Sequence, residues 1–111
     1  MSKTYYHYTT KECAEHIIND KALKSPYGLV FACETEEDML KFTYVNFRIG
    51  RIESLDNYCV IKFKSNGKAE ESYDHSSKFY ADARAVVFSS HQLKIKPIKV
   101  IPLRTFLKEL V

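Results

Sequence analysis

Apolar and aromatic positions are grouped along the chain in short runs separated by polar, turn-forming stretches. Several runs are four to nine residues long and rich in aromatic or β-branched residues, as expected of β-strands. The run LVFAC has the composition of a buried strand, and YCVIKFK alternates as a strand does when one face packs on a core. The predicted strands are residues 4–8, 29–33, 57–64, 83–88 and 93–101.

The last predicted strand, 93–101, is irregular. Leucine and isoleucine alternate with lysine until Pro97 and Ile98, where the alternation shifts. Proline donates no hydrogen bond to a sheet, so this pattern favours an edge strand with a bulge. The polar stretch 68–82 is assigned a partial strand followed by a loop.

Two helices are expected in the first half of the chain. Thr9 and Glu12 have the T-x-x-E spacing of a capping box, which predicts a helix that ends near Lys21. Thr35 is expected to cap a second helix, with acidic residues in its first turn where the helix dipole favours negative charge. The apolar positions are Ala14, Ile17 and Ile18 in the first helix and Met39, Leu40, Phe42, Thr43 and Phe47 in the second.

A short third helix is expected at the C-terminal end. Pro102 is suited to a first helical position, and the apolar residues after it recur at helical spacing. These residues are Leu103, Phe106, Leu107 and Leu110. The order strand, helix, strand, helix, several strands and helix predicts an α+β fold, and 111 residues suit a single domain over 1–111 with one core.

Composition narrows the class of protein. Hydrophobic residues make up 45% of the chain and charged residues 28%, which is typical of a folded domain and not of a disordered one. No stretch is apolar enough to suggest a membrane helix or a signal peptide, so a cytoplasmic protein without membrane contact is expected. Three scattered cysteines favour reduced thiols, with neither disulfides nor a metal site. The net charge of +3, concentrated after residue 92, permits a partner that carries phosphate.

Several enzyme classes are excluded by their motifs. Glycines at 28, 50 and 67 cannot form a dinucleotide-binding or P-loop motif. The chain also lacks a G-x-S-x-G nucleophile elbow and an H-E-x-x-H zinc helix.

The stretch YYHYTTKECAEHIINDKALKSPYGLVFAC, residues 5–33, resembles the N-terminal part of small ADP-ribosyltransferase-like proteins, a group similar to RNA 2′-phosphotransferases. In that family the first strand carries a histidine motif and is followed by a helix, a turn and a second strand. The resemblance implies a split antiparallel β-sandwich with two N-terminal helices and a short C-terminal one, which binds NAD as a substrate in a cleft between its sheets.

By this resemblance, His7 takes the role of hydrogen bonding to the nicotinamide-side ribose. The Tyr8 backbone would hold the nicotinamide amide, and Thr9 would add a supporting hydroxyl. Two aromatic side chains enclose the nicotinamide ring in this family. Phe31 fits the first place, and Phe42, or alternatively Tyr44, fits the second.

The family also has a carboxylate or amide late in the chain that assists transfer. The stretch DARAVVF offers Asp82 ahead of its strand, but Arg84 stands where a glutamate is expected. Three readings follow: Asp82 or Gln92 substitutes, Arg84 handles a phosphate, or the site binds without turnover. Arg48 and Arg51 are further candidates for neutralising a pyrophosphate.

The sequence therefore predicts an ADP-ribosyltransferase-like protein that transfers ADP-ribose from NAD to a macromolecular acceptor, with nucleic acid slightly favoured over protein. The catalytic candidates are His7, Asp82 and Arg84. A bacterial or phage effector, such as a toxin or a counter-defence protein, would suit the small size. The alternative is an inactive module on the same fold that binds a nucleotide or a protein.

Overall fold

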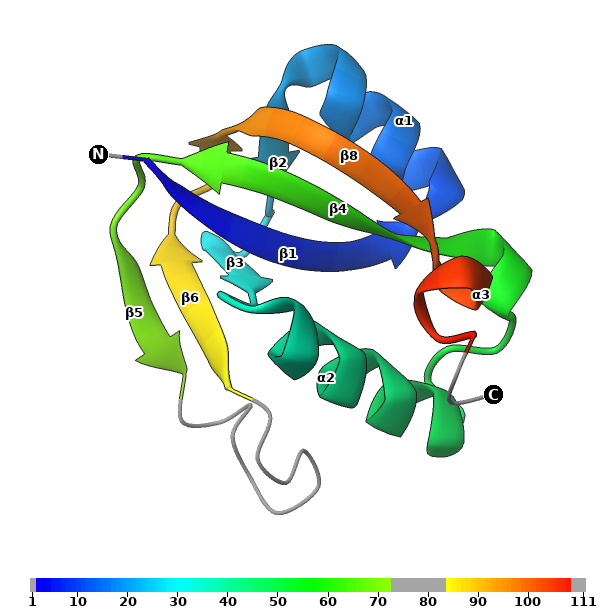
Figure 1. Cartoon of the computed structure of the whole chain (residues 1–111). Helices are drawn as coiled ribbons and strands as arrows, with labels where there is room; N and C mark the ends of the chain where they lie inside the picture. Colours follow the sequence, from blue (N-terminus) through cyan, green and yellow to red (C-terminus); the bar gives the residue numbers. More distant parts are fainter. Residues whose placement is uncertain (1, 73–83, 109–111) are drawn as a thin grey trace.

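The computed structural model describes residues 2–72 and 84–108 (Figure 1). Its elements follow one another in an α+β order, as the sequence pattern predicts. They are β1 (Lys3–Thr10), α1 (Lys11–Asp20), β2 (Ala22–Lys24), β3 (Leu29–Ala32), α2 (Glu36–Arg48), a 3₁₀ turn (Leu55–Asn57), β4 (Tyr58–Ser65), β5 (Ala69–Ser72), β6 (Ala85–Ser89), β7 (Gln92–Lys94), β8 (Lys96–Pro102) and α3 (Leu103–Phe106).

The strands form three antiparallel sheets. Their orders are β1-β4-β8, β2-β7 and β3-β6-β5. The first and third sheets meet at one point, where the backbones of Tyr6 and Cys33 exchange two hydrogen bonds of 2.8 Å. Beyond this bridge β1 and β3 are not paired, and this opening positions the candidate site.

The sheet β1-β4-β8 separates two apolar clusters. One cluster lies between this sheet, helix α1 and the other two sheets, and it includes Tyr5, Ile61 and Phe63. The other lies under α2 and α3, and it includes Tyr6 and Val60. Successive residues of a strand point to opposite faces, so β1 and β4 contribute alternately to both clusters.

Helix α1 begins one residue later than the sequence predicts. Thr10, not Thr9, is its N-cap, and the Thr10 hydroxyl accepts a hydrogen bond of 3.2 Å from the backbone N–H of Cys13. The capping-box assignment was wrong because β1 stays paired with β4 through Thr10, opposite Tyr58. Glu12 then falls one position short of the place from which a glutamate reaches back to the cap.

The other helices follow the pattern closely. Thr35 caps α2 and accepts a hydrogen bond of 3.1 Å from the N–H of Asp38, as predicted. The side chains of Leu103 in α3 and of Leu107, its C-cap, are fully buried. Pro102, expected at the first helical position, is instead the N-cap, because it still pairs with Cys59 at the end of β8. Leu110 lies outside the described residues.

The C-terminal strand pattern is divided in two. The expected strand 93–101 is β7 and β8, interrupted at Ile95, because β7 pairs with β2 whereas β8 pairs with β4. The predicted bulge is confirmed, since the β4–β8 register passes from Lys99 to Pro97 and skips Ile98. Strand β2 was not predicted. None of the helices in the described part of the chain is long and apolar enough to cross a membrane.

Candidate functional site

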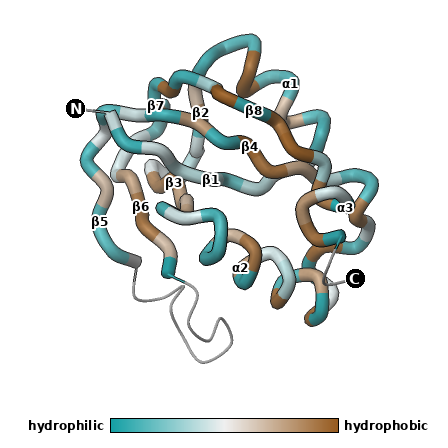
Figure 2. The backbone as a smooth tube through the Cα atoms, viewed as in Figure 1, coloured by the Kyte–Doolittle hydropathy of each residue, from teal (hydrophilic) through white to brown (hydrophobic). Residues whose placement is uncertain are grey.

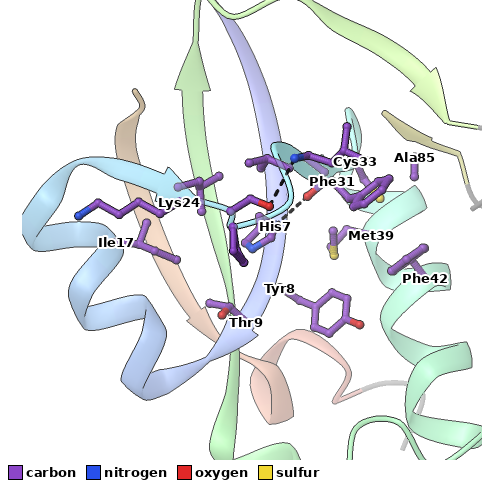
Figure 3. A pocket seen from close by; sticks show the side chains of 16 residues that line it. His7, Tyr8, Thr9, Ile17, Lys24, Phe31, Cys33, Met39, Phe42 and Ala85 are labelled. Carbon is purple, nitrogen blue, oxygen red and sulfur yellow. Dashed lines mark hydrogen bonds between the residues drawn. The ribbon is translucent and has the colours of Figure 1, made fainter. Parts of the chain in front are cut away.

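A cavity of about 400 Å³ opens where β1 and β3 diverge (Figure 3). Both apolar clusters contribute to its wall, together with the turn after β2. A volume of this size is in the range of small-molecule sites. The lining residues are His7, Tyr8, Thr9, Ile17, Leu23, Lys24, Ser25, Pro26, Leu29, Val30, Phe31, Ala32, Cys33, Met39, Phe42 and Ala85.

His7 spans the opening between the two strands. Its Nδ1 lies 2.7 Å from the backbone oxygen of Phe31 (Figure 3). The carbonyls of Phe31 and Cys33 point to the same side of β3, because they are two residues apart, and Cys33 already bonds to Tyr6 on β1. The backbones of β1 and the β3 segment are hydrogen-bonded only at Tyr6 and Cys33, and the His7 side chain adds a second hydrogen bond between them.

The tautomer of His7 follows from this contact. A carbonyl oxygen only accepts hydrogen bonds, so Nδ1 is the protonated nitrogen and donates to Phe31. Burial lowers the pKa of His7 below its usual value, and the bond to Phe31 opposes this shift only in part. In the neutral ring, Nε2 then carries a lone pair and is a hydrogen-bond acceptor.

Tyr8 and Thr9 follow His7 along the cavity. The peptide groups of Tyr8 point to the same side of β1 as those of Tyr6, away from β4 and towards the opening. The ring of Tyr8 packs on Phe42 at 5.8 Å and on Tyr58 at 6.3 Å between centroids. Thr9 is half-buried at the cavity wall.

The two aromatic candidates, Phe31 and Phe42, both line the cavity. Phe31 comes from β3 and is half-buried, whereas Phe42 comes from α2 and is 7% exposed. Of the two residues considered for the second place, only Phe42 lines the cavity. Tyr44 packs against the cluster under α2 and α3 instead. Strands β1 and β3 and helix α2 thus bring together five residues that the sequence indicates.

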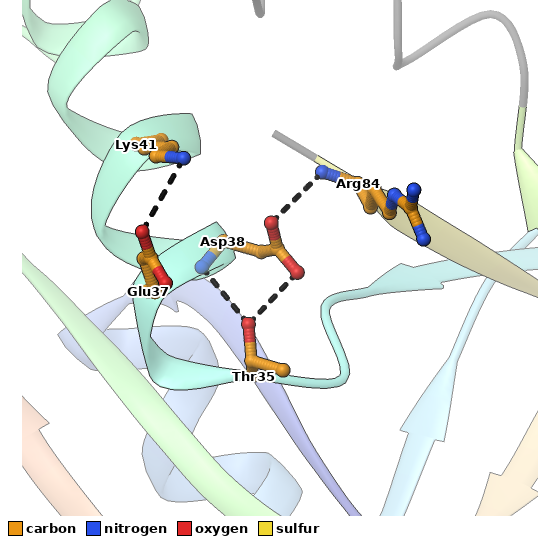
Figure 4. A network of polar contacts seen from close by, with 5 residues as sticks. All are labelled: Thr35, Glu37, Asp38, Lys41 and Arg84. Carbon is orange, nitrogen blue, oxygen red and sulfur yellow. Dashed lines mark hydrogen bonds and ion pairs between the residues drawn. The ribbon is translucent and has the colours of Figure 1, made fainter. Parts of the chain in front are cut away.

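The two late-chain candidates that the structure describes, Arg84 and Gln92, do not line the cavity. Arg84 is exposed ahead of β6, and its backbone N–H donates to Asp38 Oδ1 at 3.2 Å (Figure 4). Its neighbour Ala85 does line the cavity. Asp82 lies outside the described residues. Gln92 pairs with Lys24 across β7 and β2 and is exposed.

Asp38 connects the first turn of α2 to the residue just before β6. Its Oδ2 accepts a hydrogen bond of 2.8 Å from the Thr35 hydroxyl, while Oδ1 accepts from Arg84 (Figure 4). Sequence reasoning placed Asp38 only in the favourable first turn of the helix. Its contact with Arg84 joins residues 46 positions apart, for which the sequence carried no local signal.

The turn between β2 and β3 supplies lining residues that sequence reasoning missed. Lys24 and Ser25 belong to the stretch KSPYG, in which proline and glycine indicate only a turn. Lys24 is exposed and forms an ion pair of 3.1 Å with Asp20. Among the described lining residues Lys24 is the one permanent charge, and none is a carboxylate. Arg48 and Arg51 are not among them.

Metal binding has no evident place in the described part of the chain. No three histidine, cysteine, aspartate or glutamate side chains there are close enough together to hold an ion. Comparisons of the chain with protein-family models, with curated proteins and with solved structures found no match.

Proposed function

We propose that the cavity binds the nicotinamide riboside half of NAD and that the protein is ADP-ribosyltransferase-like, with a fold related to the split β-sandwich of that family. The observation that carries this proposal is the gathering of His7, Tyr8, Thr9, Phe31 and Phe42 around one cavity. The strand motif indicates His7, Tyr8 and Thr9, and the aromatic pair of the resemblance indicates Phe31 and Phe42. The five residues come from three separate elements.

Each residue has a role that its chemistry fits. Neutral His7, oriented by Phe31, would accept a hydrogen bond from a ribose hydroxyl through Nε2. The Tyr8 peptide groups point away from β4 towards the opening, and they would hydrogen-bond the nicotinamide carboxamide. The rings of Phe31 and Phe42 would pack on the cationic nicotinamide ring, for which aromatic faces are attractive partners.

The reaction would exchange one bond at the ribose C1′ for another. The bond from C1′ to the nicotinamide nitrogen breaks, and nicotinamide leaves with the bonding electrons. A nucleophile of the macromolecular acceptor, nucleic acid slightly favoured over protein, bonds to the same carbon, and its proton passes to a base. An oxocarbenium-like transition state of this kind gains from polar groups held in place around it.

A second candidate is supported by the composition of the wall. The described lining residues include no carboxylate to assist transfer or to take a proton. An inactive module that binds a nucleotide in the same cavity would need none. The two candidates differ in turnover and not in ligand.

Nicotinamide release and thermal unfolding in the presence of NAD would test both candidates. Wild type should be stabilised by NAD on the scale RT ln(1 + [L]/Kd), about 2.7 kcal/mol at a hundredfold excess over Kd. His7→Ala should lose this stabilisation, while His16→Ala, which changes an exposed histidine on α1, should keep it.

The outcomes separate the candidates. Release from wild type that is lost in His7→Ala establishes the transferase. Stabilisation without release establishes the binding module. If NAD neither stabilises wild type nor releases nicotinamide with it, NAD is rejected as the ligand.

A further inference from the structure

Four lysines face one another across two strands of the main sheet. In the β4–β8 register Lys62 lies opposite Lys99, and Lys64 lies opposite Lys96. Like charges directly opposite each other in a sheet destabilise it. Two pairs of this kind therefore lower the stability of the sheet, and a bound anion would relieve their repulsion.

All four side chains lie on one face of the sheet. Lys62 and Lys64 are two residues apart on β4, and the bulge at Ile98 keeps Lys96 and Lys99 on the matching side of β8. Val60, on the same face of β4, is fully buried in the cluster that includes Leu103 of α3. The lysines occupy the remaining half of this face, which α3 leaves uncovered (Figure 1).

This half of the face is accessible. Lys64, Lys96 and Lys99 are exposed and Lys62 is half-buried. Figure 2 shows hydrophilic stretches beside hydrophobic ones along β4 and β8. Next to Lys64 and Lys96 lies a depression of about 260 Å³. Its lining residues are Ser2, Lys64, Ser65, Asn66, Lys94, Ile95 and Lys96.

Among the described residues, no acidic side chain forms an ion pair with this array. In the part of the chain that the structure describes, the ion pairs involve Lys3, Lys24, Lys41 and Arg104, and none involves a lysine of the array or Lys94. Lys62 has a ring contact, with its Nζ 5.9 Å from the centroid of Tyr6. The array thus presents its positive charges to solvent.

Protection of a sheet edge explains only half of the array. Lysines on an edge strand discourage pairing with other chains, and this accounts for Lys96 and Lys99 on β8. Strand β4 is central, with β1 on one side and β8 on the other, so Lys62 and Lys64 have no edge to protect. Their position calls for a different reason.

We propose that this lysine face binds the sugar-phosphate backbone of a nucleic acid strand. Alternate residues of a strand are about 6.7 Å apart and neighbouring strands about 4.8 Å apart, so the array offers regularly spaced charges to a row of phosphates. Lysine contacts phosphate as a flexible point charge and does not read bases. Binding is accordingly independent of sequence and strongly dependent on salt.

The proposal stands whether or not the cavity binds NAD, because none of these lysines lines the cavity. If the cavity does bind NAD, the lysine face supplies a reason for a nucleic-acid acceptor in place of a protein. An oligonucleotide assay without NAD tests the lysine face alone.

Fluorescence anisotropy with a labelled oligouridylate RNA, measured over a series of salt concentrations, would test the proposal. Four phosphate contacts predict a slope of log affinity against log salt of about −2.8, at about −0.7 for each contact on a single strand. Lys96→Gln with Lys99→Gln should halve the slope to about −1.4. This variant should also be at least as stable as wild type, since it removes one partner from each repulsive pair.

The matched control is Lys11→Gln with Lys41→Gln, which removes the same charge from α1 and α2. It should keep the wild-type slope. Equal losses in both double variants would show an effect of net charge and overturn the proposal. Absence of RNA binding by wild type would also overturn it, and so would binding only to polyglutamate or to phosphatidylserine vesicles.

Discussion

The imidazole of His7 connects β1 to the backbone oxygen of Phe31 on β3 across 2.7 Å, at the point where the two strands cease to pair. This bond determines which nitrogen carries the proton, and burial keeps the ring neutral by lowering its pKa. A histidine is suited to this place because it donates to the strand on one side and offers an acceptor on the other.

The lowered pKa of His7 predicts a dependence of stability on pH. The unfolded chain binds a proton at His7 below the ordinary pKa of about 6.5, whereas the folded chain binds it only at lower pH. The contribution of His7 to the free energy of unfolding is therefore fully present above about pH 6.5. It is lost as the pH falls through the folded pKa.

Urea unfolding of wild type and His7→Gln between pH 7.5 and pH 5 would measure this effect. The difference between the two proteins should shrink as the pH falls, because glutamine does not titrate. Nitrogen NMR of the ring should show the proton on Nδ1 at neutral pH. A proton on Nε2, or a constant difference in stability, would contradict the assignment of a buried neutral donor.

The cap of α1 gives a second prediction. Thr10→Ala removes the acceptor for the N–H of Cys13 and should lower the free energy of unfolding by about 1 kcal/mol. Thr9→Ala is the matched control, because Thr9 belongs to the β1–β4 ladder and makes no cap. A larger loss of helix stability in Thr9→Ala than in Thr10→Ala would restore the capping box that the sequence suggested. Thermal unfolding followed by circular dichroism would decide between them.

The sequence was informative where local pattern determines position. Local patterns predict a strand for His7, another strand for Phe31 and a helix for Phe42, and the corresponding elements β1, β3 and α2 enclose one cavity. Thr35 was found because a helix cap is a local hydrogen bond.

Non-local pairing escaped prediction. Strand β2 is only three residues long, and it forms because it pairs with β7, about 70 residues later in the chain. The same pairing interrupts the C-terminal strand pattern at Ile95. The lining residues Lys24 and Ser25 depend on that pairing. The shift from Thr9 to Thr10 has the same origin, since Tyr58 on β4 keeps the end of β1 extended.

The three cysteines should differ in reactivity. Burial and the nearby Asp38 carboxylate raise the pKa of Cys33 to about 12, and burial also raises the pKa of Cys59, whereas Cys13 is exposed on α1. Because the thiolate is the reactive form, iodoacetamide near neutral pH should label Cys13 alone in the folded protein. Mass spectrometry should then find three labels after unfolding in urea. Cys13→Ser should abolish labelling of the folded protein, and rapid labelling of Cys33 in that variant would contradict its burial.

Gly67 is placed where a side chain does not fit. A Cβ atom there would lie 2.7 Å from Leu93 Cδ1 and 3.1 Å from Phe88 Cδ1, and both side chains are buried in the core. Gly67→Ala should therefore lower the free energy of unfolding by about 1–3 kcal/mol, the usual cost of overpacking. Gly50 is the matched control. A Cβ at Gly50 meets nothing within 4 Å, but the backbone has φ +84°, so Gly50→Ala costs about 1–2 kcal/mol through backbone strain alone.

A second substitution, Leu93→Ala, distinguishes the steric cost at Gly67 from the backbone strain at Gly50. Leu93→Ala removes the atom that Gly67→Ala would strike, so the double variant should be more stable than the sum of the two single losses, and urea unfolding of all four proteins gives the coupling energy. The same Leu93→Ala background should leave the cost of Gly50→Ala unchanged, because no atom near Gly50 is affected. Strict additivity at Gly67 would mean that the core between β6 and β7 accommodates the extra methyl group, and it would contradict the steric explanation.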